Sequence, residues 1–215
     1  MDIQQAKQIV CDAGRKLVKE GLVARTWGNI SIRVDDKTFV ITPSGRTYEA
    51  LTPDDIVEVR IEDLNYEGSV KPSSEKGLHA EVYKQSSEIN AVVHTHQMNA
   101  STVAAARREV PHVNEDMARL IGPSIRVAPY GLPGTGKLAK GTAAALKGRK
   151  AALMANHGAV CIGKDMEEAF DVSRTLEAVC EEYIQQEFMK ENSEVKKFDP
   201  ARMHEIYLTK YAGRS

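Results

Sequence analysis

The sequence predicts one α/β domain over residues 1–215, built on a largely antiparallel or mixed sheet with helices packed on it. Three observations predict this class. Strand-like segments joined by a short turn come early in the chain, and strands then alternate with helical segments. The composition, with 42% apolar and 27% charged residues, is that of an ordinary globular protein with one good core.

The first half of the chain supplies a helix, a hairpin and a further strand. Residues 3–20 place apolar side chains at helical spacing, and Gly21 is placed to end that helix. Segments 29–34 and 38–42 run apolar or alternate on either side of a short polar turn, which is typical of a β-hairpin. Residues 56–61 alternate cleanly and predict another strand.

In the second half, helical and strand-like segments follow one another. Ser74 is the expected N-cap of one helix and Asp165 of the last. Residues 110–123 show no clear pattern. The predicted order is helix 75–86, strand 89–96, helix 98–108, strand 125–130, helix 137–148, two strands within 151–163 bent at 156–158, and helix 165–190.

Charge and cysteine content exclude several classes of protein. The formal net charge is −1, so no long-range field attracts nucleic acid or an anionic membrane, and neither is an expected partner. Cys11, Cys161 and Cys180 are odd in number and unclustered, which favours reduced thiols. The first residues do not resemble a signal peptide, and no apolar run reaches membrane-spanning length. We therefore expect a cytoplasmic protein.

Three histidines follow or interrupt apolar strand-like runs. His94 and His96 close the segment AVVHTH, and side chains two apart on a strand point the same way. Such a pair alone is equally explained by a core histidine beside a strand cap. His157 in MANHGAV, next to a glycine, adds a third imidazole and favours a catalytic metal site with open positions. Packing or surface position better explains the other histidines, His79, His112 and His204.

An acidic residue and two polar clusters suggest what such a site binds. Glu75 follows two serines at a predicted helix start, where it is explained either by capping or by a general acid/base role beside an anion. The clusters TWGNISI and TPSGR combine hydroxyls with glycine, which suits phosphate binding without lysine. Each cluster alone is an ordinary turn, and their occurrence together with three histidines favours the functional interpretation.

Six motifs, TWGNIS, TPSG, KPSSE, AVVHTH, APYG and ANHG, resemble in order and spacing the class II sugar-phosphate aldolase/epimerase family. The likeness covers roughly residues 5–190, and the motif order is most similar to that of the fuculose-phosphate members. It implies a three-layer α/β/α fold around a mainly antiparallel sheet. It also implies a homo-oligomer, usually a tetramer, with active sites at subunit interfaces and a tail, 198–215, that reaches a neighbouring subunit.

Carried over position by position, the resemblance implies that His94, His96 and His157 bind Zn²⁺ or another divalent cation such as Mn²⁺ or Co²⁺. Glu75 takes the place of the catalytic acid/base, and a glutamate there is typical of the aldolases rather than the epimerases. The implied phosphate-binding residues are Thr26, Gly28, Asn29, Thr42, Ser44, Gly45, Ser73 and Ser74.

Two positions depart from the family pattern. Glu115 stands where the family has a tyrosine from the neighbouring subunit, and Pro133 stands where it has a phenylalanine. Both positions contact the aldehyde half of the substrate in the family, so the aldehyde stays open here. The second proton donor also stays open among Glu115, Asp116, Tyr207 and Tyr211.

The resemblance implies a lyase: a metal-dependent aldolase that cleaves a ketose 1-phosphate, of the fuculose-phosphate type or a 5-deoxypentulose 1-phosphate, to dihydroxyacetone phosphate and an aldehyde through an enediolate. Alternatives within the family are a decarboxylase, a dehydratase or a 4-epimerase of sugar phosphates. A more remote alternative is a P-loop nucleotide-binding enzyme, because 131–137, GLPGTGK, fits that pattern. Leu138 argues against it, because Ser or Thr should follow the lysine.

Overall fold

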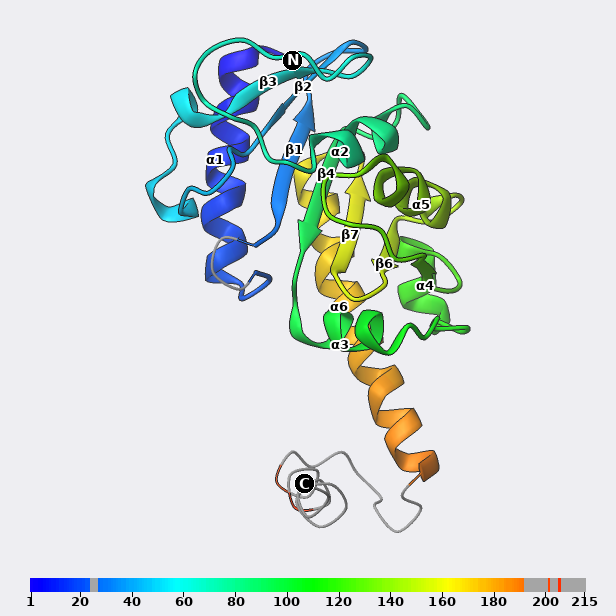
Figure 1. Ribbon diagram of the computed structural model, residues 1–215. Coiled ribbons are helices and arrows are strands. Elements are labelled where there is room, and N and C mark those ends of the chain that lie inside the picture. Colours follow the sequence, from blue (N-terminus) through cyan, green and yellow to red (C-terminus); the bar gives the residue numbers. More distant parts are fainter. Residues whose placement is uncertain (24–26, 192–200, 202–204, 206–215) are drawn as a thin grey trace.

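The computed structural model describes residues 1–23, 27–191, 201 and 205, and its elements follow the predicted order (Figure 1). The helices are α1 (Ile3–Lys19), α2 (Lys76–Tyr83), α3 (Met98–Ala106), α4 (Glu115–Ile121), α5 (Gly136–Leu146) and α6 (Met166–Glu191). The strands are β1 (Asn29–Arg33), β2 (Thr38–Ile41), β3 (Val57–Arg60), β4 (Ala91–Thr95), β5 (Arg126–Ala128), β6 (Ala151–Met154) and β7 (Gly158–Gly163).

The strands form one seven-stranded sheet in the order β3-β2-β1-β4-β7-β6-β5. Every neighbouring pair is antiparallel except β5 and β6, which run parallel. β4 lies at the centre of this order, and all five of its residues are buried because both faces of the sheet are covered there. The predicted α/β class with a mainly antiparallel sheet is therefore confirmed.

Helices cover both faces of the sheet and make three layers (Figure 1). On one face, α2 and α5 contribute Leu78 and Leu138 to a core cluster that also contains Val92 of β4. On the other face, α1 and α6 contribute Leu17 and Phe170 to a cluster that contains Val93. Neighbouring residues of a strand point to opposite faces, which explains why the two valines belong to different layers.

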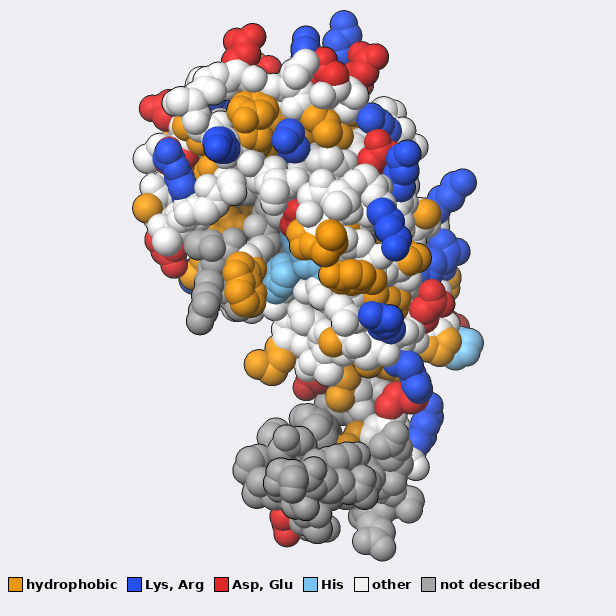
Figure 2. All heavy atoms as spheres, viewed as in Figure 1, with side chains coloured by type: hydrophobic (Ala, Val, Ile, Leu, Met, Phe, Trp, Pro, Cys, Tyr) orange, Lys and Arg blue, Asp and Glu red, His pale blue; other side chains and the backbone are white. Residues whose placement is uncertain are grey.

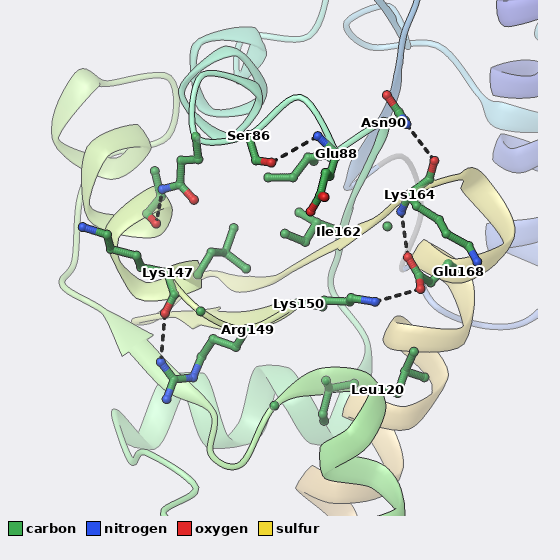
Figure 3. Close-up of a pocket in the computed structure, with 18 of the residues that line it drawn as sticks. Ser86, Glu88, Asn90, Leu120, Lys147, Arg149, Lys150, Ile162, Lys164 and Glu168 are labelled. Carbon is green, nitrogen blue, oxygen red and sulfur yellow. Dashed lines mark hydrogen bonds and ion pairs between the residues drawn. The ribbon is translucent and has the colours of Figure 1, made fainter.

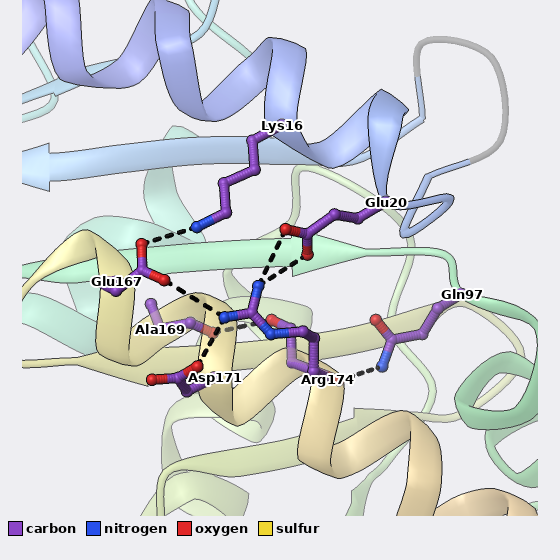
Figure 4. Close-up of polar contacts among 8 residues, drawn as sticks. Lys16, Glu20, Gln97, Glu167, Ala169, Asp171 and Arg174 are labelled. Carbon is purple, nitrogen blue, oxygen red and sulfur yellow. Dashed lines mark hydrogen bonds and ion pairs between the residues drawn. The ribbon is translucent and has the colours of Figure 1, made fainter.

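Polar contacts connect α6 to α1 and to the segment after β4 (Figure 4). Lys16 of α1 contacts Glu167 at 2.7 Å, one of several surface ion pairs, each of which contributes only up to about 1 kcal/mol. A buried contact matters more for the site. The side-chain amide of Gln97 donates to the Ser173 carbonyl at 2.9 Å. Because Gln97 directly follows His96, this bond ties the end of β4 to α6.

The start of α2 differs from the prediction. Ser74 is not its N-cap: Glu75 occupies that position, and the Glu75 N–H donates to Ser73 Oγ at 3.2 Å. The side chain of Glu75 makes no capping bond, because its carboxylate is bonded instead to Asn29. Ser73 therefore supports the turn that presents Glu75.

The remaining differences lie in a short helix and in element ends. Residues 110–123 contain α4, whose N-cap Asn114 accepts the Met117 N–H at 3.0 Å. Seven residues make fewer than two turns, too few for a clear periodic pattern. α5 ends at Leu146, two residues before the predicted end. None of the helices that the structure describes is both long and apolar enough to cross a membrane.

Candidate active site

The central sheet and one tight turn bring His94, His96 and His157 together. His94 lies in β4, His96 just after it, and His157 in the turn between β6 and β7. The Nε2 atoms of His94 and His96 are 3.0 Å apart. One ring nitrogen from each of the three side chains lies within 4.8 Å of the others. The three imidazoles thus face one point, although His157 is far from the other two in sequence.

Local backbone geometry explains this convergence. His94 and His96 are two residues apart, so both side chains point to the same side of the strand. In the β6–β7 turn, Asn156 adopts a positive φ of 56°, a conformation that asparagine tolerates well. Gly158 follows and lets β7 approach β4 closely. A Cβ there would clash with the Thr95 carbonyl oxygen and lie 3.2 Å from the His94 ring.

Replacing Gly158 with alanine is expected to destabilise the fold by about 1–3 kcal/mol, because the added methyl group forces β7 away from β4. The displaced His94 ring should also weaken the binding of divalent metal. Chemical denaturation and metal titration measure the two effects. Gly136→Ala is the matched control, since nothing lies within 4 Å of a Cβ at that position, and its stability should change by no more than about 1 kcal/mol. Equal losses in the two variants would contradict the close-approach argument.

Hydrogen bonding orients the His94 ring, and burial favours the neutral form of His96 and His157. Nδ1 of His94 donates to the Ala159 carbonyl at 2.8 Å, which turns Nε2 toward the other two rings. Burial is the main cause that lowers the pKa of His96 to about 3 and the pKa of His157 below its ordinary value. Within the described part of the chain, Nδ1 of His157 is buried without a hydrogen-bond partner. Neutral imidazole is the form that binds metal, so this donor set fits a divalent cation.

Glu75 faces the histidines from the start of α2. Its Oε2 accepts an N–H from Asn29 at 2.9 Å and lies 3.3 Å from Nε2 of His94, and its Oε1 lies 3.5 Å from Nε2 of His157. Burial alone would raise the pKa of the Glu75 carboxyl, but the contacts with His94, His157 and Asn29 outweigh it and hold the pKa below its usual range. An ionised carboxylate in this position can accept a proton from a bound ligand and return it.

A cavity of about 470 Å³ opens beside this cluster, a size that suits a small organic ligand. Figure 2 shows a recess on this face with histidine side chains (pale blue) inside it and hydrophobic side chains near its rim. The lining residues are Trp27, Gly28, Asn29, Pro43, Ser44, Gly45, Ser73, Ser74, Glu75, His96, Pro133, Asn156 and His157.

Two polar segments of this lining, around Ser44 and around Ser73, lie side by side because a β-bridge pairs Pro43 with Pro72. The Ser44 N–H donates to the Lys71 carbonyl at 2.9 Å, and the Ser73 N–H donates to the Thr42 carbonyl at 3.0 Å. The bridge thereby brings Ser44 beside Ser73 and Ser74. Short hydroxyl side chains and backbone N–H groups gathered in this way suit the oxygens of a phosphate group.

Most of the expected phosphate-site residues line the cavity, and among the described ones only Thr42 does not appear in its lining. Thr42 is buried, and its Oγ1 accepts the Ile30 N–H at 3.2 Å, so it supports the strand pair rather than facing the cavity. Thr26 lies outside the described residues. The residues that line the cavity as expected are Gly28, Asn29, Ser44, Gly45, Ser73 and Ser74.

Of the expected catalytic residues, only Glu75 is found at the cavity among the described part of the chain. Glu75 lines the cavity, and Pro133, at the position of the family's phenylalanine, lines it too. Glu115 is exposed at the start of α4 and is not part of the lining. Tyr207 and Tyr211 lie outside the described residues.

Two residues at the site were not singled out as functional by the sequence patterns. Trp27 is 55% exposed, lines the cavity and has its ring centroid 6.0 Å from that of His96. His79 is buried, as packing would suggest, but its Nε2 also contacts Oδ1 of Asn29. The sequence does contain one indication that His79 lies near the site: it follows Glu75 by about one helical turn and so shares its helix face.

The glycine-rich segment 131–137 helps to shape the same cavity. Gly134 has a positive φ of 78° and passes so close to Ser74 that a Cβ would lie 3.1 Å from its carbonyl oxygen. α5 then begins at Gly136, with Thr135 as its N-cap. Close packing against the serine segment therefore explains the glycine at position 134 without a bound nucleotide.

A larger hollow of about 1420 Å³ is bordered by α2, α4 and α5 (Figure 3). Its polar groups pair with one another: Lys150 contacts Glu168 at 2.7 Å, and the Asn90 side chain donates to the Lys164 carbonyl at 3.0 Å. Its described lining contains neither Glu75 nor the three clustered histidines. This hollow is therefore not the candidate active site.

Comparisons with known proteins agree with one another. Residues 8–184 match the family described as Class II Aldolase and Adducin N-terminal domain. The chain is 36% identical over 186 residues to 5-deoxy-D-ribulose 1-phosphate aldolase of Bacillus thuringiensis serovar kurstaki, covering 86% of this chain and 87% of that protein. It is 35% identical over 179 residues to L-fuculose phosphate aldolase of Escherichia coli K12, covering 83% and 82%. A solved structure of L-fuculose 1-phosphate aldolase aligns with a TM-score of 0.80 and 31% identity, over 97% of this chain and 96% of that one.

Proposed function

The chain belongs to the class II aldolase and adducin family, and we propose that it is a lyase that cleaves the C3–C4 bond of a ketose 1-phosphate. The products are dihydroxyacetone phosphate and an aldehyde. The observation that carries this proposal is the convergence of His94, His96 and His157 beside Glu75. The adjoining cavity, with its hydroxyl-bearing lining, supports a phosphorylated substrate.

The proposed substrate is a 5-deoxypentulose 1-phosphate. The relative from Bacillus thuringiensis carries the name of an aldolase for such a sugar, and cleavage between C3 and C4 of a 5-deoxypentulose leaves acetaldehyde. The lining also includes Trp27 and Pro133, two apolar side chains that suit the methyl end of that aldehyde. The serine-rich part of the lining suits the phosphate.

Three converging imidazoles fit a divalent cation, and we propose Zn²⁺, with Mn²⁺ or Co²⁺ as alternatives, held by His94, His96 and His157. When bound, such an ion supplies Lewis-acid stabilisation of the negative charge that develops on the substrate oxygens as the bond breaks. The buried bond from His94 to the Ala159 carbonyl orients that ring for this task.

Glu75 moves a proton at C3 in this proposal. In the condensation direction its carboxylate accepts a proton from C3 of dihydroxyacetone phosphate, and in cleavage it returns one to the same carbon. Oε2 is held by Asn29, whereas Oε1 is buried without a hydrogen-bond partner among the described residues. Oε1 is therefore the oxygen available to the substrate.

The C4 oxygen needs a second proton carrier. The candidates are Glu115, Asp116, Tyr207 and Tyr211, and we propose that one of them reaches the site from a neighbouring subunit of a homotetramer. Glu115 is exposed on its own chain and does not line the cavity, which is consistent with such a role.

A panel of ketose 1-phosphates tests the proposed function. The metal-loaded protein is mixed with 5-deoxyribulose, 5-methylthioribulose, fuculose and ribulose 1-phosphates, and dihydroxyacetone phosphate is measured by a coupled assay. We expect kcat/KM for the 5-deoxy sugar to exceed that for ribulose 1-phosphate by about 10–100-fold, because the ring surfaces of Trp27 and Pro133 favour a methyl group over a hydroxyl. Products of dehydration or epimerisation without dihydroxyacetone phosphate would refute the aldolase proposal.

A further inference from the structure

Five buried polar side chains connect the carboxylate of Glu75 to the far end of α2. Glu75, His79 and Tyr83 follow one another at intervals of four residues and so share one face of the α2 segment. Asn29 and Ser31 are two residues apart on β1 and point to the same side of that strand. Each of the five is at most 6% exposed. The proposed mechanism assigns roles only to Glu75 and Asn29 among them, and the packing of α2 on the sheet does not require the other three to be polar.

These side chains form one continuous hydrogen-bond chain that alternates between helix and strand. Asn29 Nδ2 donates to Glu75 Oε2 at 2.9 Å, and Asn29 Oδ1 lies 2.5 Å from Nε2 of His79. Nδ1 of His79 lies 2.6 Å from Ser31 Oγ. That hydroxyl lies 2.7 Å from the hydroxyl of Tyr83. No water is needed to connect the carboxylate to the tyrosine.

The chemistry of the groups fixes the direction of each bond. The ionised carboxylate of Glu75 only accepts, so Asn29 turns its NH₂ group to Glu75 and its carbonyl to His79. A carbonyl only accepts, so His79 carries its proton on Nε2. Burial lowers the pKa of His79 to about 3, so the ring is neutral and its Nδ1 accepts the Ser31 proton. The serine oxygen then accepts from Tyr83.

We propose that His79 is a positioning residue for the reaction: as the Nε2–H tautomer it fixes the Asn29 amide, which holds Oε2 of Glu75 and leaves Oε1 to the substrate. This inference rests on the proposed role of Glu75. With the proton on Nδ1 instead, Nε2 and the Asn29 carbonyl would be two acceptors facing each other. Asn29 would then turn over, and Glu75 would lose its donor.

Packing alone does not require a histidine at this position. The ring of Phe39 stacks on His79 with centroids 6.5 Å apart and planes 10° apart, a contact that an apolar side chain could also make. Burying two ring nitrogens costs free energy unless both find partners. Both nitrogens of His79 have partners: Nδ1 contacts Ser31, and Nε2 contacts Asn29, which in turn binds Glu75.

Two amide variants separate positioning from packing. A glutamine amide reaches the position of the histidine Nε2, so His79→Gln keeps a donor for Asn29, whereas the shorter amide of His79→Asn reaches only the Nδ1 position. We expect kcat close to wild type in His79→Gln and about 10–100-fold lower in His79→Asn. KM and metal content should stay unchanged in both. Equal kcat values in the two variants, with matching thermal unfolding, would overturn the proposal.

Neutron diffraction from wild-type crystals tests the chain without substrate or turnover. We expect deuterium on Nε2 of His79 and a Ser31 hydroxyl directed at Nδ1. Deuterium on Nδ1 would overturn the proposal even if both variants failed to fold. Because this measurement is independent of activity, it separates the two failures: an absence of cleavage by the wild type counts against the proposed function alone.

Discussion

Replacing Glu75 with glutamine is expected to lower the rate of aldol cleavage by about 10²–10⁴-fold, the range for loss of a positioned general acid/base. Glutamine keeps the size of the side chain and an oxygen that can accept the Asn29 N–H, so the fold should persist. It cannot accept or return a proton at C3. Steady-state kinetics with the best substrate of the panel, alongside metal analysis of the purified variant, measure the effect.

Metal content should remain that of the wild type, because the proposed ligands are histidines. Glu62→Gln, an exposed position in the loop after β3, is the matched control and should behave as wild type. Unchanged turnover in Glu75→Gln would remove this carboxylate from the mechanism. Loss of metal together with activity would instead make Glu75 a ligand.

Replacing His94 with alanine is expected to weaken divalent metal binding by more than about 100-fold, since even outer partners of metal ligands are worth about 10–100-fold. Cleavage should fall to the level of the metal-free protein. His94 is the most central of the three, with no exposed surface and a bond that orients its ring. Metal content by elemental analysis and activity after adding excess Zn²⁺, Mn²⁺ or Co²⁺ are the measurements.

Because alanine also leaves a space in the core, thermal unfolding should be recorded for the variant. His96→Ala, at a less buried position, should lose metal with a smaller loss of stability. His112→Ala, at an exposed loop position, is the matched control and should keep both metal and activity. Full metal occupancy in His94→Ala would contradict the proposed ligand set.

The clustering of the three histidines could be predicted because short local rules decide it. The HxH pair depends only on the alternation of a strand, and His157 lies at a turn marked by Asn156 and Gly158. Central burial of β4 follows from its uninterrupted apolar run. These local features, together with motif order, were enough for the fold class and the family.

Features that depend on contacts between distant segments could not be predicted in this way. Nothing near His79 in the sequence shows that β1 places Asn29 against one of its nitrogens and Ser31 against the other. Thr42 has the residue type of a phosphate ligand, yet its hydroxyl completes the backbone of β1. The N-cap of α2 is Glu75 and not the predicted Ser74, because a tertiary contact, the bond from Asn29, directs the Glu75 side chain.

The proposed chemistry depends on one divalent ion that His94, His96 and His157 share beside Glu75. Anomalous diffraction from crystals of the metal-loaded protein, with data on both sides of the zinc edge, tests it most directly. We expect one peak per chain, about 2.0–2.1 Å from a nitrogen of each ring. Crystals in which the zinc peak lies elsewhere, or in which the ring of His157 points away from the ion, would contradict it.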